Sequence, residues 1–201
     1  MNPLKSVTGT VVSGLVIAVA IGLLTDLQGP DSARVVIWLH VIAGVCWIGL
    51  LYYFNLVQVQ ALAEAAGDTG GPGGGGITKY VAPRALLWFR WAALVTWLSG
   101  ATYLIETGNF MNAFTLGNMP VNGSPTYGLT IGVGAWMGTI MLFNVWILIW
   151  PNQKKVLGMV EATAEQIAKA KSTALMASRT NTMLSIPMLM SMIGAHHGYF
   201  I

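Results

Sequence analysis

Residues 35–58, VVIWLHVIAGVCWIGLLYYFNLVQ, contain no Lys, Arg, Asp or Glu, and this stretch decides the fold. A transmembrane α-helix needs about 20 consecutive apolar residues, and this run is long enough to cross a bilayer. The whole chain has the same character, because 55% of its residues are hydrophobic and only 8% are charged. Soluble domains carry roughly 25% charged residues. The sequence therefore predicts an all-α integral membrane protein.

Four more segments have the length and apolar composition of membrane spans, which gives about five spans in total. They cover residues 8–25, 84–105, 127–150 and 176–197. We expect spans two to five to form a four-helix bundle within a single membrane domain. Between the spans, residues 67–76 are rich in glycine and are expected to be flexible. Residues 156–175 are rich in helix formers and predict a cytoplasmic helix that runs into the last span.

The basic residues of the loops predict the orientation of the spans, because cytoplasmic loops carry an excess of Lys and Arg. With the N-terminus in the cytoplasm and the C-terminus outside, only Arg34 lies on the outer side. The inner side then holds Lys5, Lys79, Arg84, Lys154, Lys155, Lys169 and Lys171. This bias accounts for the net charge of +3, and we expect no nucleic-acid partner.

All three histidines fall in one predicted layer at the outer side of the membrane. His40 lies near the start of span two, and His196 and His197 lie at the end of span five. Imidazole is a common ligand of haem iron and of metal ions, so His40 with His196 or His197 could hold haem b. A copper or zinc ion is a second candidate for the same side chains. The alternative is that His196 and His197 contact interfacial water and that His40 bonds a neighbouring helix.

The single cysteine, Cys46, excludes Cys-based metal cages, and the chain has no C-x-x-C-H motif for covalent haem attachment. Cys46 is therefore expected to be an apolar packing residue.

A second predicted layer, nearer the inner side, contains polar groups from four spans. Its members are Asn55, Arg90, Asn144, Arg179 and Asn181. A charged side chain inside a membrane is costly unless it is paired, and few acidic residues are available. Backbone carbonyls, the asparagine amides or an anion could take that role. The candidate anions are a haem propionate, a lipid phosphate and an anionic substrate. Alternatively, both arginines extend to the inner surface.

Several segments resemble the membrane part of the urate oxidase N-terminal domain family, and together they cover most of spans two to five. They are WLHVIAGVCWIG at 38–49, WFRW at 88–91, NVW at 144–146, WPNQKK at 150–155, SRTNT at 178–182, LSIP at 184–187, and His196. The first segment is also similar to the first helix of haem-binding membrane protoporphyrinogen oxidases and of copper-resistance membrane proteins.

The resemblance implies a multi-pass protein of the bacterial inner membrane that is linked to redox chemistry. It singles out His40, Arg90, Asn144, Arg179, Asn181 and His196 as candidate site residues. Family members with the presumed oxidase activity are longer and carry a c-type cytochrome tail, which these 201 residues do not include. Such a partner would then come from another chain.

These observations predict a membrane subunit of a redox complex that binds haem b and assists electron transfer. Its expected partners are other membrane subunits, a c-type cytochrome and lipids. One alternative is a cofactor-free accessory subunit of a larger membrane oxidoreductase, and another is a urate oxidase-like enzyme that needs a partner cytochrome c. A transporter is disfavoured, because no acidic pathway crosses the spans.

Overall fold

The computed structural model describes residues 2–25, 31–120 and 122–198, and the regular structure within these ranges is entirely helical. The chain divides into two compact units, residues 1–35 and 36–201, and each is described by itself. The second unit contains nearly all of the packed structure.

The first unit is built around one apolar helix. A short 3₁₀ turn, η1 (Pro3–Lys5), is capped by Asn2, whose side chain accepts a hydrogen bond from the Leu4 N–H at 2.9 Å. Helix α1 (Val7–Thr25) follows, and none of its residues is buried. An apolar helix of this length is long enough to cross a membrane.

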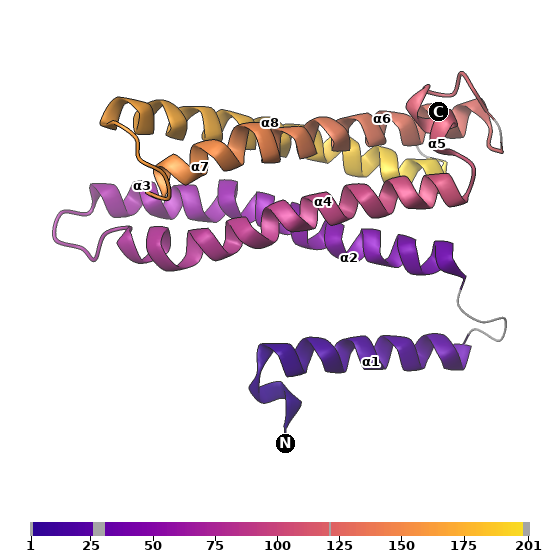
Figure 1. Ribbon diagram of the computed structural model, residues 1–201, viewed down its shortest axis with the longest axis horizontal. Helices are drawn as coiled ribbons and strands as arrows, with labels where there is room; N and C mark the ends of the chain where they lie inside the picture. The colour runs from indigo at the N-terminus through magenta and orange to yellow at the C-terminus, as the bar shows by residue number, and fades with distance from the viewer. Residues whose placement is uncertain (1, 26–30, 121, 199–201) are drawn as a thin grey trace. The chain divides into compact units, whose positions relative to one another are not determined.

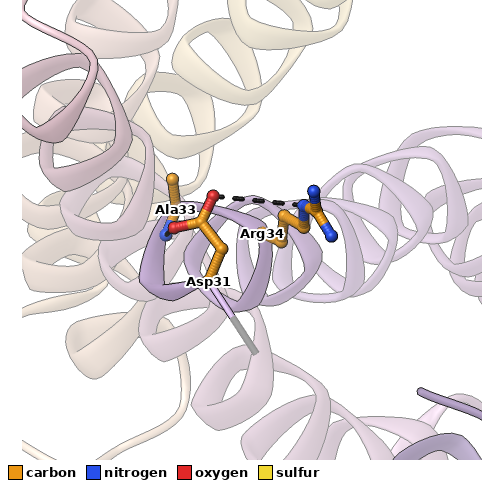
Figure 2. A network of polar contacts seen from close by, with 3 residues as sticks. All are labelled: Asp31, Ala33 and Arg34. Carbon is orange, nitrogen blue, oxygen red and sulfur yellow. Dashed lines mark hydrogen bonds and ion pairs between the residues drawn. The ribbon is translucent and has the colours of Figure 1, made fainter. Parts of the chain in front are cut away.

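Helix α2 (Ser32–Tyr52) directly follows Asp31, whose side chain caps its first turn. The Asp31 carboxylate accepts a hydrogen bond from the Ala33 N–H at 3.1 Å, and Arg34 Nε lies 4.0 Å from the same carboxylate (Figure 2). An acidic side chain at this position stabilises the first turn, because it pairs an N–H that has no partner within the helix.

The second unit consists of four long helical rods (Figure 1). The first continues from α2 through the π-helical segment η2 (Tyr53–Gln58) into α3 (Val59–Gly67), and the second from the π-helical segment η3 (Ile77–Val81) into α4 (Ala82–Glu106). The third is α6 (Pro125–Phe143), π-helical η4 (Asn144–Ile149) and α7 (Trp150–Val156), and the fourth is α8 (Ala164–His197). The short helix α5 (Phe110–Phe114) connects α4 with α6.

Contacts between neighbouring rods close them into a bundle. The Trp97 indole N–H of α4 donates to Thr139 Oγ1 of α6 at 2.9 Å, and the Ser191 hydroxyl of α8 donates to the carbonyl of Thr130 in α6. Tyr52 of α2 and Ser185 of α8 share a hydrogen bond of 3.0 Å. On the remaining side, the rings of Phe54 and Phe89 meet edge to face at 5.3 Å and join η2 to α4. The predicted four-helix bundle is thus confirmed.

The interior is filled by a few large side chains and many small ones. Trp47, Leu51, Phe89 and Met141 are buried in the main apolar cluster. Helices α6 and α8 approach closely at Gly134, where an added Cβ would lie 3.0 Å from Ser191 Oγ and 3.1 Å from Met192 Cε. Small residues let helix backbones approach closely, which favours packing in an apolar solvent.

Some boundaries differ from those that the sequence predicts. The helix expected at 156–175 begins at Ala164, because Thr163 caps it and Gly158 takes a positive φ of 69° in the preceding turn. It then runs without a break into the last predicted span. The glycine-rich loop is shorter than residues 67–76, since Gly75 and Gly76 are already helical.

The polar connection at residues 106–126 contains α5, whose Asn112 is fully buried. The side-chain amide of Asn112 donates to the Ser124 carbonyl at 3.1 Å and ties this connection to the start of α6.

Three helical segments of the described chain are long and apolar enough to cross a membrane: Val7–Thr25, Ser32–Gly67 and Pro125–Val156. Predicted spans three and five correspond to α4 and α8, which are more polar because α4 carries Arg84 and Arg90 and α8 carries an inward polar stripe. The outward faces of these two helices are nevertheless apolar, with Trp88 and Ile186 both more than 60% exposed. Large exposed apolar surfaces are rare on soluble monomers.

We predict that Gly134→Leu destabilises the bundle, because the new side chain would separate α6 from α8 at Ser191. Overpacking of this kind typically costs about 1–3 kcal/mol. A thermal unfolding curve in detergent should show a lower midpoint. Gly49→Leu is the matched control, since an added Cβ at Gly49 meets nothing within 4 Å. Equal midpoints for both variants would contradict the packing described here.

Candidate functional site

His40 lies half-buried between α2 and α4. Its Nδ1 is 2.8 Å from the carbonyl oxygen of Thr96. The imidazole also rests against Gly100, where an added Cβ would lie 2.8 Å from its Cε1 and 2.9 Å from its Nδ1. Gly100 therefore makes room for the ring beside the Thr96 carbonyl.

This hydrogen bond decides which nitrogen of His40 carries the proton. A carbonyl oxygen can only accept, so Nδ1 is the donor and the neutral ring keeps a lone pair on Nε2. Histidines that ligate metals almost always donate their other ring N–H to a carbonyl or carboxylate, which fixes the tautomer and the ring orientation. His40 thus has the local arrangement of a ligand whose Nε2 is available.

The other two histidines lie at the C-terminal end of α8. The start of α2 and the end of α8 are at the same end of the second unit (Figure 1), as the predicted topology requires. His196 and His197 are both exposed, and the His196 ring meets Tyr127 of α6 edge to face at 5.8 Å. Within the described ranges, no group of three or more His, Cys, Asp or Glu side chains is placed to hold a metal ion.

Two predicted site residues, Asn144 and Asn181, meet inside the bundle. Asn144 Nδ2 donates to Asn181 Oδ1 at 2.8 Å, and Asn181 Nδ2 donates to the Met141 carbonyl at 2.9 Å. Asn181 has no exposed surface. The pair joins α8 to the junction of α6 and η4, where the backbone hydrogen bonds change from i→i+4 to i→i+5.

Asn55 connects the first rod to α8 in a similar way. Its Nδ2 donates to the Leu51 carbonyl at 2.9 Å and to Ser178 Oγ of α8 at 2.8 Å. Asn55 lies within the π-helical segment η2, as Asn144 begins the π-helical segment η4. Two π-helical segments therefore present asparagines to the same helix, and such segments occur frequently at functional sites.

Sequence reasoning missed the partners that α8 supplies to this layer. Ser178 bonds Asn55, and Ser185 bonds Tyr52. Ser178, Asn181 and Ser185 follow helical spacing, since positions three and four apart share one face. That polar stripe within an apolar span was the signal that could have identified them.

Arg90 is stabilised by an aromatic ring that sequence reasoning did not identify. Its Cζ lies 3.7 Å from the centroid of the Trp150 ring in α7, and Lys154 Nζ lies 5.9 Å from the same centroid. Cations within about 6 Å of an indole centroid are attracted by the ring. Arg90 therefore packs on α7, and no hydrogen bond joins it to Asn144 or Asn181 within the described ranges.

Arg179 does not join the polar layer either. It is exposed on α8, although it is adjacent in sequence to Ser178, which points inward to Asn55. Neighbouring helix positions point about 100° apart. The structure thus brings Asn144 and Asn181 together and leaves His40, Arg90 and Arg179 in separate surroundings.

A cavity of about 330 Å³ lies among the ends of α3, α4, α7 and α8. Its lining is mainly apolar and includes Phe54 and Phe89, with Gln58, Gln153 and Lys171 as its longer polar side chains. Gln58 Oε1 is buried and has no hydrogen-bond partner among the described residues. The cavity is thus a candidate site for a small apolar molecule that carries a hydrogen-bond donor.

Comparison with known proteins gives one family. The model of the family described as "Urate oxidase N-terminal" matches residues 32–119 and 124–201. No curated protein and no solved structure matches significantly. The match includes all four rods of the second unit, together with His40, the Asn144–Asn181 pair and Arg90. The chain therefore belongs to the urate oxidase N-terminal family.

Proposed function

We propose that this chain is a membrane subunit of a redox complex that binds haem b through His40 and assists electron transfer. The observation that carries the proposal is the hydrogen bond from His40 Nδ1 to the Thr96 carbonyl, which leaves Nε2 as the free nitrogen. The family match adds support, because it connects the chain with urate oxidase-like membrane proteins.

The surroundings of His40 support its proposed role as a haem ligand. His40 would hold the haem through Nε2, Thr96 would orient the imidazole ring, and Gly100 gives the ring its space. His196 and His197, at the same end of the bundle, are the other candidates that would help to hold it. When bound, the haem would supply an iron that accepts and releases one electron at a time.

The proposal includes a multi-pass arrangement in the bacterial inner membrane, with five spans and a cytoplasmic N-terminus. Support comes from the way the helices pack: α2 and α6 are each part of a segment long enough to cross, and α4 and α8 bond to them along their lengths. If α2 and α6 are inserted, α4 and α8 must share their depth. The basic residues of the predicted inner loops set the orientation.

A cofactor-free accessory subunit is the second candidate, and the polar interior favours it. Asn144, Asn181, Asn55 and Tyr52 bond one another, a serine of α8 or the backbone, and Arg90 stacks on Trp150. None of these pairings requires a ligand. In that role the histidines would contact partner chains.

The family match also favours a urate oxidase-like activity. Urate would lose two electrons and two protons, and a c-type cytochrome from another chain would accept the electrons one at a time. The purified complex should then reduce added cytochrome c only when urate is present. Loss of this activity in His40→Ala would support the role.

The haem itself is tested by spectroscopy. A reduced-minus-oxidised optical spectrum of the gently solubilised protein should show a b-type signal that His40→Ala abolishes. Native mass measured on the same sample should identify co-purifying chains. A spectrum without a Soret band in cofactor-replete protein, with partner chains present, would instead establish the accessory role.

A second variant tests the positioning of the ring. Gly100→Ala should displace the imidazole from the Thr96 carbonyl, because the new Cβ would lie under 3.0 Å from two ring atoms. Loss of such an orienting partner typically costs 10–100-fold in metal affinity. Haem should therefore dissociate about that much more readily than from Gly49→Ala, whose added Cβ has open space. An unchanged haem affinity would exclude His40 as the ligand.

The topology is tested with single cysteines introduced into a Cys46→Ala background. Asn118→Cys, between α5 and α6, should react with a membrane-impermeant maleimide in intact cells, because the topology places it outside. Gly75→Cys, between α3 and α4, should react only after the cells are permeabilised. The reverse labelling pattern would invert the orientation, and labelling of both sites in intact cells would remove the crossing by α4.

A further inference from the structure

The cationic pair at Trp150 has no acidic partner. Arg90 and Lys154 both lie over the Trp150 ring, at 3.7 and 5.9 Å from its centroid, and neither forms an ion pair within the described ranges. An unpaired charge in a membrane protein is costly, and the cost rises with depth. An anion beside Arg90 and Lys154 would offset both charges and complete the site.

An apolar groove lies on the same side of the bundle, between α4 and α6. It has a volume of about 380 Å³ and a wholly apolar surface. Six of its lining residues are Leu94, Trp97, Leu98, Phe143, Trp146 and Ile147. The Trp97 N–H beside it donates to Thr139 Oγ1, Thr139 in turn donates to the Ala135 carbonyl, and the Trp146 N–H is buried without a hydrogen-bond partner among the described residues. The groove therefore offers only hydrocarbon to a ligand.

The cationic pair and the groove are consecutive parts of one surface. Arg90, Leu94 and Leu98 are spaced by four residues on α4, so they share a face. On the facing rod, Trp150 lies one turn before Lys154. The groove residues Trp146 and Ile147 come directly before Trp150 along the same rod. The rings of Trp91 and Trp146 meet edge to face at 5.5 Å where the two parts join.

We propose that this surface binds one anionic phospholipid of the cytoplasmic leaflet. Its phosphate lies at Arg90 and Lys154, and one acyl chain lies along the groove between α4 and α6. The guanidinium of Arg90 lies over Trp150, and its N–H groups, which have no hydrogen-bond partner among the described residues, would donate to phosphate oxygens.

The dimensions agree with this occupant. Eight residues separate Arg90 from Leu98, which corresponds to about 12 Å along a helix. One leaflet contributes about half of the roughly 30 Å hydrocarbon core. A chain that starts at the cationic pair would therefore follow the groove through most of its own leaflet. The site depends on membrane insertion but not on haem, so it can fail while the proposed redox function stands.

The test uses the full-length protein in nanodiscs of phosphatidylcholine with a minor fraction of phosphatidylglycerol. Native mass spectrometry after detergent extraction should show one retained phosphatidylglycerol. Arg90→Gln and Lys154→Gln should each lower the retained fraction at least fivefold, and the double variant should abolish it. Lys155→Gln is the matched control, because this neighbouring cation lies about 100° around the helix from Lys154, and it should retain the lipid.

The acyl-chain part of the proposal has its own variant. Leu94→Trp should fill the groove and reduce retention of phosphatidylglycerol while both cations remain. Ile186→Trp adds the same bulk to the exposed face of α8, away from the groove, and should have no effect. Thermal midpoints of all variants identify any that fail to fold, and the surface variant Lys154→Gln keeps the test decisive if Arg90→Gln is unstable.

The outcomes separate the lipid from other ligands. Retention of phosphatidylcholine equal to that of phosphatidylglycerol would overturn the anionic site. Displacement of the lipid by millimolar inorganic phosphate, with no effect of Leu94→Trp, would indicate a free-anion site and overturn the lipid assignment. Equal retention by the wild-type protein and the double variant would remove the cationic pair from the site.

Discussion

The hydrogen bonds of Asn181 show the constraint on which the bundle depends. Its amide accepts from Asn144 and donates to the Met141 carbonyl, with no surface exposed to solvent. In an apolar environment an unpaired amide is costly, so a buried polar side chain must find its partner on a neighbouring helix. The register of α8 against α6 follows from this requirement, since a shift of one turn would leave all these groups unpaired.

The same constraint explains the irregular backbone of the bundle. Asn55 donates to the Leu51 carbonyl at the start of one π-helical segment, and Asn181 donates to the Met141 carbonyl just before another. Both segments change the spacing of backbone hydrogen bonds, and both asparagines bond carbonyls near the change. Helix α8 completes both junctions through Ser178 and Asn181, so it holds the layer together.

His40 and Arg90 belong to a different class from these asparagines. His40 is positioned by a backbone carbonyl, and one ring nitrogen remains uncommitted. Arg90 is positioned by an aromatic face, and its N–H groups keep their donor capacity. In both cases the bundle fixes the position of a polar side chain but leaves some of its hydrogen-bonding groups unused. This is the usual arrangement at a binding site. The asparagine layer, in contrast, is mostly satisfied from within.

The sequence by itself determined the helical class, the approximate position of every long helix, the four-helix bundle and the family. Long apolar runs permit few other structures, because in lipid the backbone must satisfy its own hydrogen bonds. It also identified Asn144 and Asn181 as members of one layer. Only the tertiary structure decided that His40 bonds Thr96, that Arg90 lies on Trp150, and that Arg179 faces outward. These outcomes depend on helix rotation and on the wider turns of the π-helical segments. A small rotation changes which side chains meet across an interface while leaving the hydropathy pattern unchanged.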